Sequence, residues 1–374
     1  MRKISIAVPV LFLVFCLAFA SCRAESEAVV RVDNTAPRIS VPKYAELEKL
    51  YSLDVTEISL FDKDDFFEPY IDFDVDNRMY IFDSYENRMS VFDDRGKLVK
   101  RFGRSGQGPK EFSQVSKIRV NKDKIYVFHE ITNIKIVNLD GEYISKNLFF
   151  IENPLEIRAS GDGFFVFRAK VDQTFTKMEF ILTFTDDQFS GGRDVFQYQY
   201  PPGLSGAIDY KFRAWNWLYV DKDGGFYFPE DNFGKYSIVR YNREGRPKII
   251  FGRPYEIKAY SKEARDRYFS LPGNDKSDAV AKFPASPPVI VKMFQDPKDN
   301  LWVISGETYE DNMNPDFENT IDIFSPNGEW LHSLKSKSIS RYSLYHNGRI
   351  YKVRPFNLES SQQLIDVYQI VYAK

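Results

Sequence analysis

The chain reads Asn77-Arg78-Met79-Tyr80-Ile81-Phe82 and, a few residues later, Val91-Phe92-Asp93-Asp94-Arg95-Gly96. The first stretch is a polar turn followed by apolar and aromatic residues, which suit a β-strand. The second is the end of an apolar strand, then polar residues and a glycine that supplies the positive φ of a hairpin turn. Together they predict a unit of turn, strand, loop, strand and glycine turn.

The first half of this unit recurs six times along the chain. Its central aromatic residues are Tyr80, Tyr126, Phe165, Phe226, Trp302 and Tyr351. Most of their spacings lie near the ~40–50 residues of a propeller blade, and we expect these rings to be buried between blades. The longest gap follows Phe226, but residues 255–287 show no paired strand pattern, so we predict an insertion there and not a seventh blade.

The glycine turn also returns, at Gly141, Gly245 and Gly328, while the third unit has Asp186-Asp187-Gln188 and no glycine, which predicts a longer hairpin. One more strand ahead of each first turn gives four antiparallel strands per unit. The predicted fold class is therefore all-β, a six-bladed β-propeller of four-stranded antiparallel blades. The last unit lacks a strand, which we assign to Val55–Leu60, so that an N-terminal strand closes the ring and protects its edges.

Composition excludes several classes of protein. Hydrophobic residues are 43% and aromatic residues 16% of the chain, and the net charge is −2. A charge so close to zero gives no field that would attract nucleic acid. The two cysteines, Cys16 and Cys22, lie near the N-terminus, which excludes a disulfide-stapled fold, and three histidines leave little material for a His-rich metal site.

The N-terminus is predicted to be a secretory signal, with Arg2 and Lys3 ahead of an apolar run to Ala20. Two cleavage sites compete. Ala18-Phe19-Ala20 fits ordinary signal cleavage, whereas Phe19-Ala20-Ser21-Cys22 resembles a bacterial lipobox, although that pattern prefers Leu at its first position. Lipidation of Cys22 is favoured because it removes the only thiol of the secreted chain. We therefore predict a signal peptide at 1–21, a tether at 22–50, and a propeller at 51–374 with an insertion at about 254–288.

The repeat units resemble NHL repeats and the bacterial six-bladed propeller lipoproteins related to them. Asp83, Asn87 and Arg88 ahead of Val91-Phe92 match the NHL stretch of Asp, Asn and Arg before an apolar strand, and Gly106-Gln107-Gly108-Pro109-Lys110-Glu111-Phe112 is similar to the family's Gly-rich connection between blades. The likeness covers about residues 52–374 and is sharp only over 76–141. It implies a six-bladed propeller of the bacterial lipoprotein type.

Polar residues follow each central aromatic by three positions and should leave the strands on the same face of the ring. As candidate ligand-binding residues at this mouth we take Asp83, His129, Arg168, Glu230, Ser305 and Arg354, with Glu230 chosen beside Pro229. The alternative is that these side chains only hold their own turns. His129-Glu130 as an acid–base pair is less favoured than a structural histidine, because no partner is identifiable.

Two further motifs imitate known sites. Asp72-x-Asp74-x-Asp76 imitates a calcium loop but has Asn77 where that loop needs Gly, so calcium is not favoured and no cofactor is predicted. The Gly-rich stretch Gly103–Gly108 lacks a following helix and is predicted to be a turn between blades and not a phosphate loop. The insertion, with a short helix predicted at Ser261–Phe269, and the acidic loop Glu307–Glu318 are candidate docking segments.

These patterns predict a lipid-anchored, non-enzymatic module outside the cytoplasm, in the envelope of a bacterium, that binds a protein, peptide or glycan or serves as an assembly scaffold within an envelope complex. It would be held to the inner or outer membrane by its acyl chains alone. The alternative is a propeller enzyme of the metal-dependent lyase, lactonase or esterase type with its site at the central channel. Such sites need several inward-pointing His, Asp or Glu side chains, and only His129 among the histidines stands at a strand end.

Overall fold

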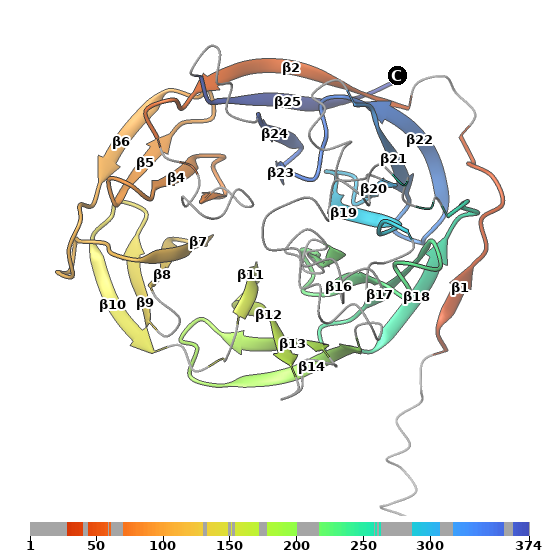
Figure 1. Ribbon diagram of the computed structural model, residues 1–374, viewed down its shortest axis with the longest axis horizontal. Helices are drawn as coiled ribbons and strands as arrows, with labels where there is room; N and C mark the ends of the chain where they lie inside the picture. The colour runs from red at the N-terminus through yellow and green to blue at the C-terminus, as the bar shows by residue number, and fades with distance from the viewer. Residues whose placement is uncertain are drawn as a thin grey trace, which may run out of the picture.

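The computed structural model describes residues 28–39, 44–58, 60, 70–129, 133–148, 151, 154–171, 178–199, 217–257, 259, 262, 286–306, 317–354 and 362–373. Within these residues the chain is built from strands and turns, with almost no helix. Six blades, each with four antiparallel strands, surround a central axis (Figure 1), which confirms the six-bladed all-β propeller. No helix in this part of the chain is long and apolar enough to cross a membrane.

The strands of a blade follow one another from the centre of the ring to its rim. Blade 1 holds β3 (Ile71–Phe73), β4 (Met79–Asp83), β5 (Arg88–Phe92) and β6 (Leu98–Phe102). Blade 2 holds β7 (Val115–Asn121), β8 (Lys124–His129), β9 (Asn133–Asn138) and β10 (Tyr143–Leu148). Blade 3 holds β11 (Pro154–Ser160), β12 (Gly163–Val171), β13 (Met178–Asp186) and β14 (Gly192–Gln199).

The second half of the ring repeats this order. Blade 4 holds β15 (Tyr219–Val220), β16 (Phe226–Pro229), β17 (Ser237–Tyr241) and β18 (Pro247–Gly252). Blade 5 holds β19 (Ile290–Gln295), β20 (Leu301–Ser305), β21 (Asn319–Phe324) and β22 (Trp330–Ser336). Blade 6 holds β23 (Ser343–His346), β24 (Arg349–Val353) and β25 (Leu364–Tyr372), and its outermost strand is β2 (Ala45–Asp54).

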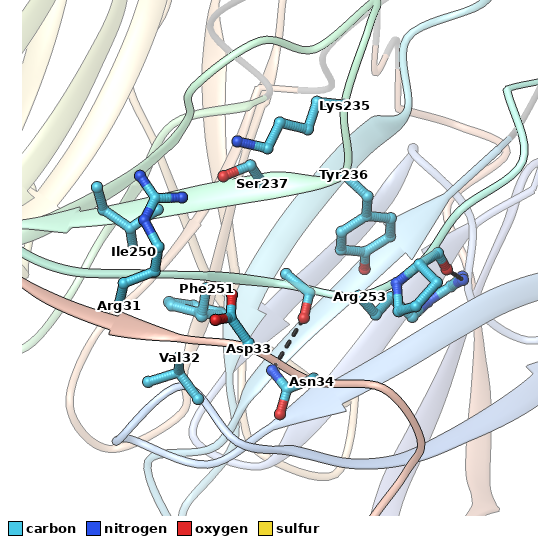
Figure 2. A pocket seen from close by; sticks show the side chains of 12 residues that line it. Arg31, Val32, Asp33, Asn34, Lys235, Tyr236, Ser237, Ile250, Phe251 and Arg253 are labelled. Atoms are coloured by element: carbon cyan, nitrogen blue, oxygen red, sulfur yellow. Dashed lines mark hydrogen bonds between the residues drawn. The ribbon is translucent and has the colours of Figure 1, made fainter.

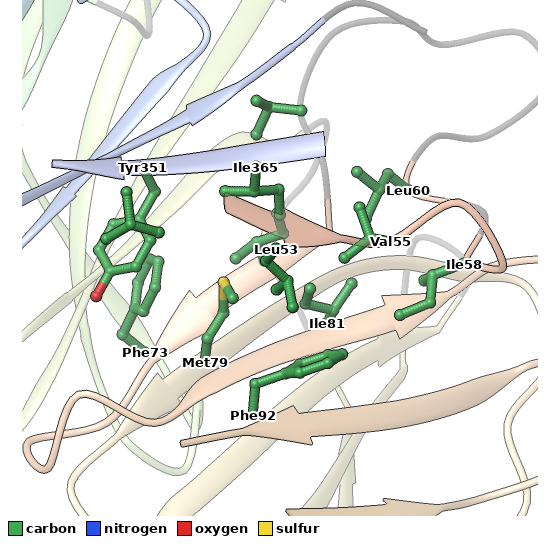
Figure 3. Close-up of a cluster of buried hydrophobic side chains, with 13 residues drawn as sticks. Leu53, Val55, Ile58, Leu60, Phe73, Met79, Ile81, Phe92, Tyr351 and Ile365 are labelled. Carbon is green, nitrogen blue, oxygen red and sulfur yellow. The ribbon is translucent and has the colours of Figure 1, made fainter. Parts of the chain in front are cut away.

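Ring closure by an N-terminal strand is confirmed, but the strand predicted at Val55–Leu60 is wrong. The strand that pairs antiparallel with β25 is β2, which precedes that stretch. Val55, Ile58 and Leu60 instead pack into the cluster of buried side chains between blades 6 and 1 (Figure 3). The sequence misled because β2 is an edge strand whose side chains mostly face solvent, whereas the apolar residues after it fill a core.

The segment predicted as a tether, residues 22–50, contains structure that the sequence did not indicate. β1 (Val30–Val32) adds to the rim of blade 4 by parallel pairing with β18. The amides of Arg38 and Ile39 then donate to the carbonyls of Trp330 and Leu331 in blade 5, each at 2.9 Å. We call residues 30–39 the N-terminal strap. Together with β2 it runs outside blades 4, 5 and 6 (Figure 1).

One hydrophobic cluster fills each of the six interfaces between neighbouring blades. All six central aromatics are at most 1% exposed, which confirms their predicted burial. The register is wrong in blade 4, however. Tyr227, and not Phe226, aligns with Tyr80 and Trp302 and faces the next blade, while Phe226 packs on blade 3. In a strand, a shift of one residue turns a side chain to the opposite face.

The other turns follow the predictions. Residues 103–114 join β6 to β7, so the Gly-rich stretch is a connection between blades. The third hairpin is one residue longer than the others, and Phe189 takes a positive φ of 55° in place of the glycine. The signal peptide with Cys22, the helix at Ser261–Phe269 and most of the insertion at 254–288 and of the acidic loop lie outside the described residues.

Candidate functional site

The six predicted site residues share one face of the ring. Asp83, His129 and Ser305 are the last residues of β4, β8 and β20. Glu230 and Arg354 directly follow β16 and β24, and Arg168 lies within β12. Because the second strands of all blades run in the same direction, these residues stand at equivalent ends. We call this side the mouth face. The opposite side, which carries the turns between first and second strands, is the turn face.

Three of the six residues are buried. Asp83, Ser305 and His129 are 2%, 5% and 8% exposed. The carboxylate of Asp83 accepts the amides of Tyr85 and Glu86 at 3.0 Å, and Ser305 donates to Asp322 at 3.3 Å. His129 lies 2.7 Å from the Ser113 carbonyl through Nδ1, so that nitrogen carries the proton. The contacts of Asp83 and Ser305 lie within their own blades, whereas His129 holds the connection between blades 1 and 2.

The other three residues reach solvent at the mouth face. The side chains of Arg354, Glu230 and Arg168 are 44%, 38% and 21% exposed. Arg354 binds Asp366 at 2.5 Å, and Arg168 binds Asp194 at 2.8 Å.

Glu230 accepts hydrogen bonds from Lys235 at 3.0 Å and from Ser237 at 2.8 Å, and these two donors lower the pKa of its carboxyl. No contact described in the structure joins two of the six, so they share a face without forming one cluster.

In the calcium-like motif, the carboxylates of Asp72 and Asp74 accept hydrogen bonds from other groups of the protein. Asp72 accepts the amide of Val120 in blade 2 at 2.7 Å. Asp74 accepts the Arg78 side chain at 2.6 Å and the Tyr80 hydroxyl at 2.9 Å, as well as two turn amides. In the part of the chain that the structure describes, no group of three or more His, Cys, Asp or Glu side chains is placed to hold a metal ion.

Sequence reasoning missed a charged cluster at the centre of the ring. Glu156 of β11 is fully buried and bonds Lys117 and Arg119 of the neighbouring strand β7. Arg158 approaches the same carboxylate at 3.4 Å. Figure 1 shows β7 and β11 beside the central axis. The sequence does contain a signal for this cluster, because charged residues stand two positions apart on the first strands of two successive blades, at Lys117 and Arg119 and at Glu156 and Arg158. This cluster joins blades 2 and 3 electrostatically across their inner strands.

The structure also forms a pocket of about 240 Å³ that the sequence could not indicate. The strap supplies one wall through residues 31–34, and blade 4 supplies the other through residues 235–237 and 250–254 (Figure 2). The Asn34 side chain closes one end by donating to the Gly252 carbonyl at 2.9 Å. Because its walls are 200 residues apart in sequence, the pocket exists only when the strap is docked.

A buried ion pair lies at the edge of this pocket. Arg253 binds Asp322 of blade 5 at 2.8 Å and stacks within 4.7 to 5.3 Å of the rings of Tyr236, Tyr255 and Trp330. Tyr236 donates to the same carboxylate at 2.8 Å. Burial, and then the charge of Asp322, raise the pKa of the Tyr236 hydroxyl, which therefore stays protonated. These contacts fasten blade 4 to blade 5 at the point where the insertion begins.

Comparison with known proteins agrees with the fold. A family model described as "6-bladed beta-propeller" matches residues 31–205, which cover the strap from Arg31 on, the closing strand β2 and blades 1 to 3. A member of the duf4221 family from Bacteroides vulgatus has a similar structure, with a TM-score of 0.55 at 13% identity, covering 89% of this chain and 100% of that chain. A Bacteroides fragilis protein aligns with a TM-score of 0.49 at 12% identity, covering 93% of this chain and all of that one. Among curated proteins, none matches significantly.

Proposed function

We propose that the protein is a lipid-anchored, extracytoplasmic propeller that binds a protein, peptide or glycan partner at its mouth face. One observation carries the proposal: the two faces of the ring differ. Short turns close the turn face, whereas the connections between blades, such as residues 103–114 and 253–289, begin and end at the mouth face. Loops held by a rigid scaffold are the usual carriers of recognition.

The side chains available to a partner follow from their exposure. Arg354, Glu230 and Arg168 reach solvent at the mouth face, whereas Asp83, His129 and Ser305 are buried and bond to other groups of the protein. The proposed contact surface therefore carries two guanidinium groups and a carboxylate, already oriented by partners in their own blades. Preoriented polar groups lose little conformational entropy when a ligand binds.

The anchoring part of the proposal rests on the N-terminal sequence. Arg2 and Lys3 precede an apolar run, and Ser21-Cys22 supplies the small residue and cysteine of a lipobox. The likeness of residues 76–141 to NHL repeats of bacterial propeller lipoproteins supports the same assignment. The mature protein would lie in the cell envelope, on the periplasmic side or at the surface, with Cys22 as its acylated first residue.

Binding at the mouth face is tested by matched pairs of variants. Arg168→Gln and Glu230→Gln neutralise mouth residues whose ion-pair partners are solvent-exposed, while Lys222→Gln and Asp299→Asn neutralise an exposed ion pair on the turn face. We expect both pairs to keep the melting temperature within a few degrees, because exposed ion pairs contribute little to stability. Material that copurifies with the anchored protein, measured by quantitative mass spectrometry, should be lost only from the mouth variants. Equal loss from both pairs would contradict the proposal.

Anchoring is tested separately. Cys22→Ser should move the protein from the membrane fraction to the soluble fraction, because a single residue carries the acyl chains. A variant that stays membrane-bound after complete signal cleavage would refute lipidation. Metal analysis of the purified protein addresses the enzyme alternative, for which one tightly held cation per chain would be the supporting result.

A further inference from the structure

The place where the chain enters the ring is fixed by β1. Val30 pairs with Ile249 near the start of β18, and the chain then runs parallel to that strand. The residues before Val30 therefore lie beside the turn Asn242–Arg246, which joins β17 to β18. Figure 1 places β1 outside β18 at the rim of the ring, on the side opposite blade 1.

The distance from this point to the proposed lipid is short. Six peptide steps separate Cys22 from Ala28, the first residue that the structure describes. An extended chain spans at most ~3.6 Å per residue, so Ala28 lies within about 22 Å of the acylated cysteine. A ring held at one point of its rim by so short a chain has that rim as its part nearest to the membrane.

The surface around this point has the chemistry of a lipid contact. Val29 and Val30 are 41% and 55% exposed. Of the five turns that join third to fourth strands, only Asn242–Arg246 has a positive net charge in sequence, from Arg243 and Arg246 against Glu244. Because Arg243 is paired with Asp162 of blade 3, we assign the lipid contact to Arg246 and the neighbouring Lys248. The equivalent turn Asp93–Lys97 of blade 1 is neutral, and the three others are acidic. Basic side chains beside a lipid anchor are attracted to anionic headgroups.

We propose that the rim of blade 4, formed by Val29, Val30 and the turn Asn242–Arg246 with Lys248 beside it, rests against an anionic lipid surface. The ring then stands with blade 4 toward the bilayer and blade 1 away from it. The inference deepens the proposed function and rests on the acylation of Cys22. It goes beyond anchoring, since a flexible tether alone would leave the ring free to tumble.

The test uses the mature protein, acylated at Cys22, in vesicles made with either neutral or anionic phospholipid. Because Cys22 is acylated, one introduced cysteine is the only reactive thiol. Glu244→Cys and Arg95→Cys occupy the same position in equivalent turns of opposite blades, since each amide bonds the first side chain of its turn. A bimane label at each site reports its distance from a headgroup quencher.

We expect the label at position 244 to be quenched several-fold more strongly than the label at position 95 on anionic vesicles. The difference should shrink on neutral vesicles and when Arg246→Gln and Lys248→Gln are combined, while the melting temperature of the parent is retained. Equal quenching at the two sites would overturn the proposed contact. So would a difference in quenching that is the same on anionic and neutral vesicles.

Failure of the anchoring itself has another signature. If Cys22→Ser protein remains on the vesicles as fully as the acylated protein, lipidation is refuted. If acylated protein is bound but labelled equally at both sites, anchoring stands and only the orientation is wrong.

Discussion

Two of the buried central aromatic residues donate a hydrogen bond to an aspartate in the turn that precedes their strand. The indole of Trp302 donates to Asp296 at 2.8 Å, and the hydroxyl of Tyr80 donates to Asp74 at 2.9 Å. Each aspartate also accepts amides of its own turn, so one carboxylate satisfies both the turn and the ring. A buried donor left without a partner would cost about 1–3 kcal/mol.

Replacing Trp302 by alanine should therefore destabilise the protein strongly. Trp302 is fully buried between blades 5 and 6, and large-to-small changes in a core cost about 3–5 kcal/mol. Tyr85→Ala is the control, since its side chain is 72% exposed and should cost less than about 0.5 kcal/mol. Denaturant unfolding measures both values. Equal denaturation midpoints for the two variants would mean that burial of Trp302 does not stabilise the fold.

At the scale of elements, the turns between third and fourth strands lock each blade onto the one before it. Gly96 lies against Tyr51, Gly141 against Phe102, and Gly328 against Phe251. Gly245 approaches the Val195 backbone most closely, since a side-chain carbon there would lie 1.7 Å from the Val195 carbonyl oxygen. The glycines thus allow both a positive φ and the close approach of two blades.

A pair of glycine substitutions separates these two effects. Gly161 has a positive φ of 58° but nothing within 4 Å of an added carbon, so Gly161→Ala should cost only about 1–2 kcal/mol of backbone strain. Gly245→Ala combines similar strain with overpacking, which adds about 1–3 kcal/mol. Thermal unfolding should rank the second variant clearly below the first. If both melt at the same temperature, the contact with Val195 does not constrain the blades.

The closing strand has an electrostatic tie at Asp366 of β25. Its carboxylate accepts Ser52 at 2.7 Å and Lys49 at 2.8 Å from β2, and Arg354 from the same blade. Burial acts to raise the pKa of this carboxyl, but the three donors outweigh it and hold the pKa below the ordinary value of 3.8. The ionised form is therefore bound more tightly in the folded state than in the unfolded state.

This shift predicts a loss of stability in acid. A lowered folded-state pKa contributes stability above the unfolded value, and this contribution disappears as the pH falls below 3.8 through the folded pKa. Asp366→Asn should be less stable than the parent near pH 7, and the gap should narrow toward pH 2. Melting temperatures across this range measure the gap. If the melting temperatures of the two proteins change in parallel with pH, ionisation of Asp366 does not stabilise the closing strand.

At the scale of the whole molecule, the N-terminal segment holds half of the ring together from outside. β1 extends blade 4, Asn34 bonds the carbonyls of Gly252 and Gly328, and β2 completes blade 6. Removing β2 would expose the edge of β25 and open the cluster between blades 6 and 1, to which Leu53 contributes. We therefore expect the closing strand β2 to contribute more to the free energy of unfolding than the strap does.

Three truncations test this order. A chain that begins at Ala28 should melt like the mature protein. A chain that begins at Tyr44 loses the strap and should lose on the order of 2–4 kcal/mol, since each net hydrogen bond contributes about 1 kcal/mol. A chain that begins at Val55 lacks β2 and should not unfold cooperatively. Calorimetry distinguishes the three, and equal stability of the last two would sink the closure argument.

The sequence by itself determined the features that depend on neighbouring residues. Alternating apolar residues and turn glycines are local signals with a fixed period, so they predicted six blades, buried central aromatics such as Trp302, and the connection at residues 103–114. They also placed the polar strand ends on one face. A shared direction of equivalent strands follows from the repeat alone, without knowledge of what each side chain touches.

The tertiary structure decided what depends on contacts between distant segments. β1 and Asn34 have meaning only against blades 4 and 5, more than 200 residues away, and no local pattern marks so short an edge strand. The same holds for Glu156, whose charge is balanced by a neighbouring blade, and for the pocket behind the strap. In blade 4 two adjacent aromatics, Phe226 and Tyr227, fit the repeat equally well, and only packing against the blades on either side selected the register.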